Sequence, residues 1–406
     1  MRTAESLQRA RTLLQLSRPA EAERELRGVL AAEPEQELAH CLLALALIGQ
    51  GKAGEAAEEA REAVRLAPES WYPHYVAGQV HYRSGQADLA VRAGEAALAH
   101  APGEAAVWEL LARAHALAGR WRQMARAAGS GLALDPESCD LAALQSMAHT
   151  RLGEAEPARR AAAHALRLDP ESAIAHLAAG RAALAFGEPG AAAGHFREVL
   201  RLDPGFGQAR DLLVTALKER NPLHRRLSAL RRSYRGGWRL LFLLPAVPPL
   251  IVVFVLIAVT HWLAWVAESV TVLRLARARA TRLLFEGAEA RVAAVCCVLP
   301  VAGAAALALG IALGAEALGT AGAAVMALVT PVQEAAHTGS HAGRAVLYAW
   351  TLLLAVAAVV AVVTGVPPVA LMAAYAALAT IWVAAWVRRA APPASAPTSV
   401  SASASG

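Results

Sequence analysis

In the first half of the chain, apolar and charged positions alternate with the spacing of amphipathic helices, and this pattern returns every 34 residues. A small residue recurs midway along the first predicted helix of each unit, at Ala10, Ala44, Gly78, Ala112, Ser146 and Gly180. Glycine recurs after that helix, at Gly51, Gly85, Gly119, Gly153 and Gly187. Proline closes each unit, at Pro34, Pro68, Pro102, Pro136, Pro170 and Pro204. Since small residues allow close helix contact, glycine a tight turn and proline a helix end, the pattern predicts repeated helical hairpins.

The second half has a different pattern, in which long apolar runs replace the alternation. The runs cover 238–266, 292–314, 317–332, 345–364 and 368–387. About 20 apolar residues are enough for a helix to cross a hydrocarbon core of about 30 Å. The run 317–332 is short and rich in glycine, so it is a marginal span. The first run contains Pro245, Pro248 and Pro249, and both a kinked span and a re-entrant hairpin are open for it.

The repeat length and its spacing of small residue, glycine and proline resemble the tetratricopeptide repeat (TPR) family. The resemblance implies an all-α fold: a TPR α-solenoid of six repeats over 1–206 with a capping helix over 207–220. A basic juxtamembrane linker (221–237) then leads to a helical transmembrane domain (238–387). The tail, 388–406, is rich in Pro, Ser and Ala and is expected to be disordered. This order of segments is similar to that of bacterial TPR membrane proteins of unassigned function.

In the TPR family, ligands lie in a concave groove lined by the first helix of each repeat, and the resemblance implies the same groove here. Its lining positions would be Tyr72, Tyr75, Gln79, Tyr82, Arg83, Glu109, Arg113, Arg151 and Arg181. Aromatic rings can anchor a peptide and arginine forks can bind its carboxylates. The alternative is an ordinary solvated helix surface. The asparagines typical of the family's carboxylate clamp are absent, so a specific reader of C-terminal carboxylates is not expected.

Charge separates the two halves further. Residues 1–220 hold 25 basic and 28 acidic side chains, whereas residues 221–406 hold 14 and 5, too few to cover a soluble surface. The basic residues after the repeats cluster before the first run, between the first two runs and after the last run. The positive-inside rule places all three clusters in the cytoplasm if 238–266 enters and returns on one side and the other four runs cross. No signal peptide is evident, so we expect a multi-pass protein of the cell membrane with cytoplasmic repeats.

Two further patterns concern lipid and self-association. The stretch 267–291 interleaves arginines with Val272, Leu275 and Leu284, which predicts a basic amphipathic helix that binds anionic lipid. Its alternative is a merely basic loop. Gly310 and Gly314 form a GxxxG pattern that suits close helix packing, either inside one bundle or between the copies of a homo-oligomer.

Little in the sequence indicates catalysis, and no cofactor or metal is expected. His81, His115 and His149 are one repeat apart, too far for a shared ion, so they are interpreted as packing residues. Glu334, His337 and His341 would share a helix face, but the glycines around them favour a loop. The leading hypothesis is a non-enzymatic, membrane-anchored scaffold that binds a protein or peptide and no nucleic acid. The alternative is a regulatory or structural subunit of a transporter or channel, for which His261, Glu316 and Glu334 are the candidate polar residues.

Overall fold

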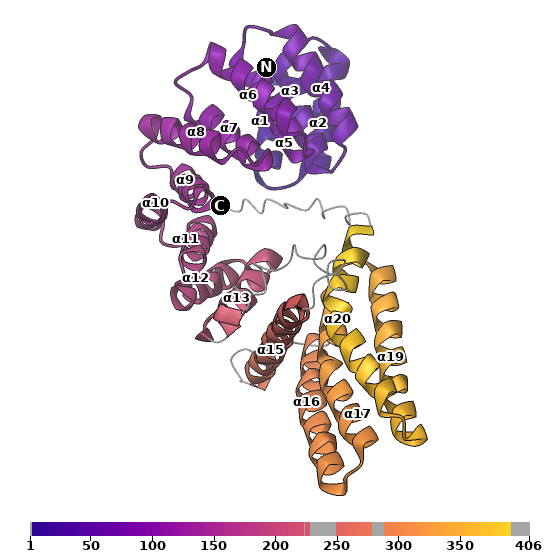
Figure 1. Cartoon of the computed structure of the whole chain (residues 1–406). Coiled ribbons are helices and arrows are strands. Elements are labelled where there is room, and N and C mark those ends of the chain that lie inside the picture. Colours follow the sequence, from indigo (N-terminus) through magenta and orange to yellow (C-terminus); the bar gives the residue numbers. More distant parts are fainter. Residues whose placement is uncertain (1, 223, 228–248, 278–287, 391–406) are drawn as a thin grey trace. The chain divides into compact units, whose positions relative to one another are not determined.

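The computed structural model describes residues 2–222, 224–227, 249–277 and 288–390, and it is helical throughout, with no strand in these ranges. The chain divides into two compact units at Leu213. We call the described residues up to Leu213 the repeat unit, and those from Val214 to Ala390 the bundle (Figure 1). The all-α prediction, with a solenoid followed by apolar helices, is confirmed.

The repeat unit consists of helix pairs, in which odd-numbered helices are the first helices of the predicted repeats and even-numbered helices the second. Their bounds are α1 Arg2–Gln15, α2 Pro19–Ala32, α3 Glu37–Gly49, α4 Ala53–Leu66, α5 Trp71–Arg83, α6 Ala87–His100, α7 Ala105–Leu117, α8 Trp121–Leu134, α9 Cys139–Leu152, α10 Ala155–Leu168, α11 Ala173–Ala185 and α12 Pro189–Leu202. A further helix, α13 (Gly207–Glu219), follows the sixth pair, and its Ala209 and Leu213 are buried.

The periodic glycines and small residues have the roles that their spacing predicts. The five glycines after the first helices all have positive φ, between 71° and 83°, a conformation that favours glycine over residues with a Cβ. Midway along α11, Gly180 lies against the ring of Phe196 on α12, with no room for a larger side chain. Gly78 of α5 lies in the same way against Leu110 of α7. Helices therefore approach closely where the repeat has a small residue.

One polar contact recurs at the start of the first helices. The ring nitrogen of His74 lies 2.8 Å from the carbonyl oxygen of Pro68, six residues earlier. His40 and His176 make the same contact at 2.8 and 2.9 Å, and the indole of Trp108 makes it at 3.2 Å. Each ring thus bonds to the carbonyl of the proline that closes the preceding unit. This explains why histidine stands at a position where one repeat has tryptophan.

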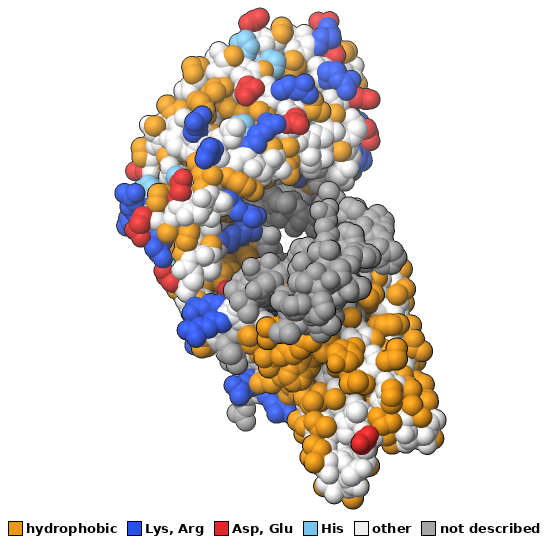
Figure 2. Space-filling model, viewed as in Figure 1, with side chains coloured by type: hydrophobic (Ala, Val, Ile, Leu, Met, Phe, Trp, Pro, Cys, Tyr) orange, Lys and Arg blue, Asp and Glu red, His pale blue; other side chains and the backbone are white. Residues whose placement is uncertain are grey.

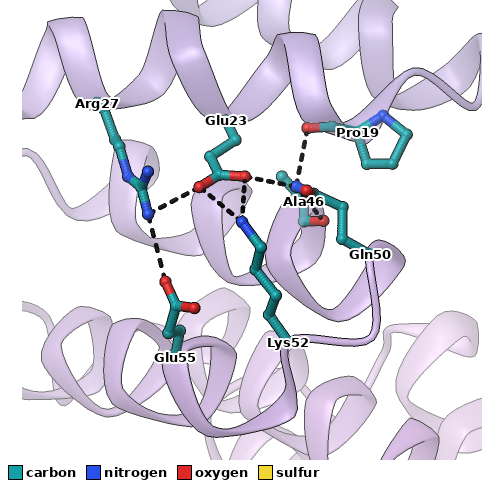
Figure 3. A network of polar contacts seen from close by, with 7 residues as sticks. All are labelled: Pro19, Glu23, Arg27, Ala46, Gln50, Lys52 and Glu55. Carbon is teal, nitrogen blue, oxygen red and sulfur yellow. Dashed lines mark hydrogen bonds and ion pairs between the residues drawn. The ribbon is translucent and has the colours of Figure 1, made fainter.

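A buried carboxylate links the first two repeats (Figure 3). Glu23 of α2 is 5% exposed and accepts hydrogen bonds from Lys52 at 2.9 Å and from the amide of Gln50 at 2.7 Å. Arg27, one turn further along α2, lies 2.7 Å from the same carboxylate and also pairs with Glu55 of α4. The hydrogen bonds from Lys52 and then Gln50 hold the pKa of Glu23 below its ordinary value. Glu23 is therefore buried as a paired anion.

From Pro249 onward, the described part of the bundle contains six helices. They are α15 Pro249–Arg277, α16 Ala288–Leu313, α17 Glu316–Ala327, α18 Val329–Ala336, α19 His341–Thr364 and α20 Pro367–Ala390. Four segments are long and apolar enough to cross a membrane: Val255–Arg277, Ala288–Leu313, His341–Thr364 and Pro367–Ala385. Hydrophobic side chains cover much of the visible face of the bundle, whereas charged side chains are scattered over the repeat unit (Figure 2).

The helices of this half differ from the apolar runs at two places. The run 317–332 is not one helix, because α17 ends at Ala327 and α18 begins at Val329. Neither helix is long enough to cross alone, although 316–336 together would span about 30 Å at the usual rise per residue. Beyond 266, where the first apolar run ends, α15 continues to Arg277 with Val272 buried in the bundle. The first part of the expected surface helix thus packs inside the bundle, and 278–287 lie outside the described residues.

Neighbouring helices of the bundle alternate in direction. Val272 of α15 packs with Ala293 of α16, near the C-terminal end of one helix and the N-terminal end of the other. The backbones of α16 and α17 meet at Gly303 against Gly322 and at Gly310 against Gly319. Gly314 has a positive φ of 64° and ends α16, so it does not extend this contact. The GxxxG pattern therefore serves packing within the bundle through Gly310.

One end of the bundle collects the ends of several helices. Ala335 of α18, Leu347 of α19 and Ala384 of α20 form one buried cluster. The end of α18 also lies beside the later part of α15, because the Gln333 amide donates to the Ser269 hydroxyl at 2.7 Å. We call this the basic end. It contains the C-terminal parts of α15, α18 and α20 and the N-terminal parts of α16 and α19.

All lysines and arginines in the described part of the bundle lie at the basic end: Lys218, Arg220, Arg225, Arg226, Arg274, Arg277, Arg291, Arg344, Arg388 and Arg389. The segment after α13 is held there because Lys218 pairs with Glu268 at 3.3 Å and Asn221 donates to Thr271 at 3.0 Å. At the opposite end, Glu316 is the one charged side chain within the described ranges. The three predicted basic clusters thus have described members at a single end.

Candidate functional site

The predicted site begins with an aromatic cluster at the start of α5. The ring centroids of Trp71 and Tyr72 are 5.6 Å apart, those of Trp71 and Tyr75 are 5.7 Å apart, and those of Tyr72 and Tyr75 are 6.3 Å apart. Burial raises the pKa of both tyrosines above the ordinary value, and Gln79 hydrogen bonds to Tyr75. Tyr82 lies further along the same helix and is half-buried. The structure therefore brings four of the predicted residues together on α5.

These tyrosines also contribute to the core. Tyr72 packs against the buried residues of the first repeats, and Tyr75 and Tyr82 pack against those of the next repeats. An aromatic ring that is half-buried in this way stabilises the repeat whether or not it binds a ligand. Replacing one of these tyrosines would therefore cost stability as well as any contribution to binding. A test of binding has to change other side chains.

Next along the first helices lies an ion cluster on α7 and α9. The guanidinium of Arg113 lies 2.7 Å from the carboxylate of Glu109, one turn earlier on α7. It also donates to Asp140 of α9 at 2.9 Å. Burial raises the pKa of Glu109, a change that Arg113 opposes. Two carboxylates of the protein thus both contact the Nη2 atom of Arg113.

Arg181 of α11 has a different set of partners. One of its nitrogens donates to the amide oxygen of Gln208 on α13 at 2.7 Å, and another lies 3.5 Å from the sulfur of Met147 on α9. No carboxylate pairs with Arg181 among the residues that the structure describes. Burial lowers the pKa of this guanidinium, and the neighbouring Arg151 lowers it further. The charge of Arg181 is therefore half-buried without an opposite charge beside it.

The two remaining predicted residues are at the ends of first helices. Arg151 is exposed and lies over the ring of Trp121 on α8, with its guanidinium carbon 4.9 Å from the ring centroid. Arg83 is exposed, and no hydrogen bond or ion pair joins it to the described residues. Arg83 therefore belongs to neither cluster, whereas Arg151 is a neighbour of Arg181 with the same charge.

Three residues of this surface were missed in the sequence: Asp140, Met147 and Gln208. Their positions within the 34-residue repeat are the signal by which they could have been found. Gln79, Arg113, Met147 and Arg181 occupy one position in successive repeats, and Tyr72, Asp140 and Gln208 occupy another. Both Arg113 and Arg181 bond to the residue 27 positions later. We call the residues on these positions, together with Tyr75 and Glu109, the first-helix face.

The bundle holds a second set of polar residues that sequence reasoning largely missed. Glu268 and Ser269 of α15 and Gln333 of α18 are each less than 9% exposed. Lys218 pairs with Glu268, and the ring of His337 lies 3.6 Å from the same carboxylate. The indole of Trp262 donates to the backbone carbonyl of Met326 at 2.7 Å, where α17 ends. These contacts satisfy buried polar groups by pairing α15 with its neighbours.

The residues considered for metal binding or transport do not converge. His261 is 5% exposed and bonds to the carbonyl of Ile257 on its own helix, so it lies inside the bundle. Glu334 is buried on α18, whereas Glu316 is exposed at the opposite end of the bundle. His341 begins α19 and is separated from α18 by a non-helical turn, as the glycines predict.

The tetratricopeptide repeat family matches residues 7–70, 75–137 and 144–205. Among solved structures, the APC/C hetero-tetramer Cut9–Hcn1 is similar to this protein at 21% sequence identity, with a TM-score of 0.47. The match covers 53% of this chain and 42% of the matched chain. PilF of Pseudomonas aeruginosa is similar over 53% of this chain and 97% of its own at 20% identity, with a TM-score of 0.45. YrrB, described as a TPR protein with an unusual peptide-binding site, matches 45% of this chain and 95% of its own at 16% identity, with a TM-score of 0.36. No curated protein matches the sequence.

Proposed function

Because residues 7–205 carry tetratricopeptide repeats, which generally form non-catalytic scaffolds for protein interaction, we propose that the protein is a membrane-anchored scaffold. Its partner is a protein or peptide that binds along the first-helix face. The bundle holds the repeats at the membrane surface. The proposal joins two separate arguments, one for the binding face and one for the anchor.

The binding face is supported by a contrast between first and second helices. Second helices carry exposed ion pairs within one helix, such as Arg65 with Glu62 on α4 and Arg201 with Glu198 on α12. Such pairs are typical of a solvated surface and contribute little. First helices instead carry half-buried aromatic and charged side chains that contact one another across repeats, including Arg113 with Asp140. Rigid aromatic and arginine side chains are the types that dominate binding energy at protein interfaces.

The anchor is supported by the four long apolar helices and by the position of the charges. Lysines and arginines of the described bundle are confined to the basic end, as they are at the cytoplasmic side of multi-pass proteins. Lys218 and Asn221 bind near the C-terminal part of α15, which keeps the segment after α13 at this same end. We therefore propose that the basic end, the repeats and the C-terminus are cytoplasmic.

Anionic lipid is a second proposed partner, at the basic end. Arg274 and Arg277 of α15 and Arg291 of α16 are exposed where the apolar helices end. Guanidinium groups at this depth attract acidic headgroups. In this proposal the lipid contacts come from these exposed arginines, since the preceding turns of α15 are buried in the bundle.

In-cell photocrosslinking tests the scaffold proposal. A photoreactive amino acid at Arg83 or Leu117, exposed and one turn beyond Gln79 and Arg113 of the first-helix face, is expected to crosslink a discrete partner. The matched controls are Arg92 and Arg126, exposed and also one repeat apart, on the second helices α6 and α8. Crosslinking from the first-helix positions alone supports the proposal. Equal yields from both pairs, or none from any position, would contradict it.

A further inference from the structure

Arg113 and Arg181 are the same structural position, two repeats apart, and each contacts the residue 27 positions later. For Arg113 that residue is Asp140, and Glu109 one turn earlier completes the pair of carboxylates. The residues equivalent to Glu109 and Asp140 around Arg181 are Leu177 and Gln208. Both carboxylates of the first cluster are thus replaced by neutral side chains in the second, while the arginine is kept.

The replacement leaves a charge that the repeat unit does not balance. Arg181 is half-buried, Leu177 one turn before it is 6% exposed, and the charged neighbour that lowers its pKa is Arg151, of like charge. Removing a guanidinium from water without an opposite charge costs free energy. The amide of Gln208 and the sulfur of Met147 satisfy hydrogen-bonding directions but supply no charge. The cost would be offset by an anion from outside the chain.

We infer that the partner supplies this anion as an aspartate or glutamate side chain that docks on Arg181. The inference rests on the proposed binding of a peptide to the first-helix face. A carboxylate is favoured over other anions because Glu109 and Asp140 show which group the equivalent fork accepts. An arginine fork binds a carboxylate through two parallel hydrogen bonds, which fixes the direction of the bound segment. Met147 and Ile174, both partly buried apolar residues near this position, favour an apolar neighbour for the acidic residue.

Selection of peptides from a random library on the full-length protein in detergent tests this inference. The wild type is expected to enrich peptides that contain an acidic residue. Arg181→Gln should abolish that enrichment, and a selected acidic peptide should bind it about 10-fold more weakly or worse. The matched control is Arg160→Gln, which removes the same charge from an exposed position on the second helix α10. It should select acidic peptides as the wild type does.

A second variant keeps the arginine and fills its fork from within. Gln208 is exposed, so Gln208→Asp should be tolerated and should recreate the pairing of Arg113 with Asp140. The Gln208→Asp protein should lose its preference for acidic peptides as the Arg181→Gln protein does. Both variants should keep any preference for apolar and aromatic residues in the peptide. Three results would overturn the inference and leave the scaffold proposal intact. These are unchanged enrichment of acidic peptides on both variants, selection on the wild type of peptides without acidic residues, and a requirement for phosphate in the selected peptides. Failure to enrich any peptide would overturn both.

Discussion

The repeat unit and the bundle are both alanine-rich and helical, yet they use glycine differently. In the repeat unit, Gly78 and Gly180 make room for the side chains Leu110 and Phe196. In the bundle, Gly303 and Gly310 of α16 lie directly against the backbone of α17. Burial of large apolar side chains stabilises a fold in water, whereas apolar side chains gain little from burial when the surroundings are lipid. Close backbone contact then becomes the main source of helix association.

The two lysines of the chain show a second difference. Lys52 and Lys218 each pair with a buried glutamate, one in each unit. In the repeat unit, the Lys52 side chain is 38% exposed and water reaches part of the network. In the bundle, the Lys218 side chain is 17% exposed and that of Glu268 is 9% exposed. The same pair is therefore partly solvated in one unit and nearly enclosed in the other.

The largest effect is expected where backbone meets backbone. Gly322→Leu would drive a side chain into the backbone of α16 at Leu307, which cannot move aside as a side chain can. We expect the bundle to lose its fold, observed as aggregation in size-exclusion chromatography of the detergent-solubilised protein. Gly339→Leu is the matched control, because Gly339 has no atom near its Cβ position. A well-folded Gly322→Leu protein would refute the contrast drawn between the units.

A smaller effect is expected from the equivalent change in the repeat unit. Gly180→Leu meets the ring of Phe196, a side chain that can shift, so the cost should be about 1–3 kcal/mol or somewhat more. Gly190→Leu on α12, where no atom lies near, controls for the added leucine. Thermal unfolding followed by circular dichroism measures both. If Gly180→Leu lowered the stability no more than Gly190→Leu, this would count against close helix packing at the position where the repeat has a small residue.

A third prediction concerns the enclosed charge of the repeat unit. Glu23→Gln removes the anion that accepts from Lys52 and Gln50, and a loss of about 1–3 kcal/mol is expected at pH 7. Because the folded pKa of Glu23 lies below its ordinary 4.5, its contribution is complete above that pH and is lost as the pH falls through the folded pKa.

Urea unfolding at several pH values checks this prediction. The difference between wild type and Glu23→Gln should shrink in acid. Glu62→Gln, which breaks an exposed pair on α4, should change stability little at any pH. A difference that stays constant down to strongly acidic pH would show that the ionised carboxylate is not what stabilises this network.

The sequence predicts the repeat unit better than the bundle, and the reason is physical. A period of 34 residues specifies which residues meet in neighbouring repeats, so the first-helix register, the turn glycines and the small positions could be assigned from spacing alone. The partners of Arg113 and Arg181 follow from that same register once one pair is seen. Half-burial of Tyr75 against the core could not be predicted, because it depends on how far neighbouring repeats rotate.

In the bundle no period relates one helix to the next. The apolar runs 292–314, 345–364 and 368–387 each fall on one long helix, but Leu328, where the helix breaks between α17 and α18, lies inside an apolar run. The extension of α15 to Arg277 was missed because its buried polar residues look like a solvated surface in sequence. Ser269 and Gln333 satisfy each other only through contact between helices that are 64 residues apart. Such pairs are visible in the fold and not in local composition.

The central claim, that cytoplasmic repeats are tethered by a membrane-crossing bundle, is tested most directly by cysteine labelling in intact cells. Each variant lacks the four native cysteines and carries one new cysteine. The new cysteine stands at Gly28 in the repeat unit, at Gly339 at the basic end or at Glu316 at the opposite end. All three positions are exposed. An impermeant thiol reagent should label Glu316→Cys alone, and all three should react after permeabilisation. Labelling of Gly28→Cys or Gly339→Cys in intact cells, or protection of Glu316→Cys, would contradict the account.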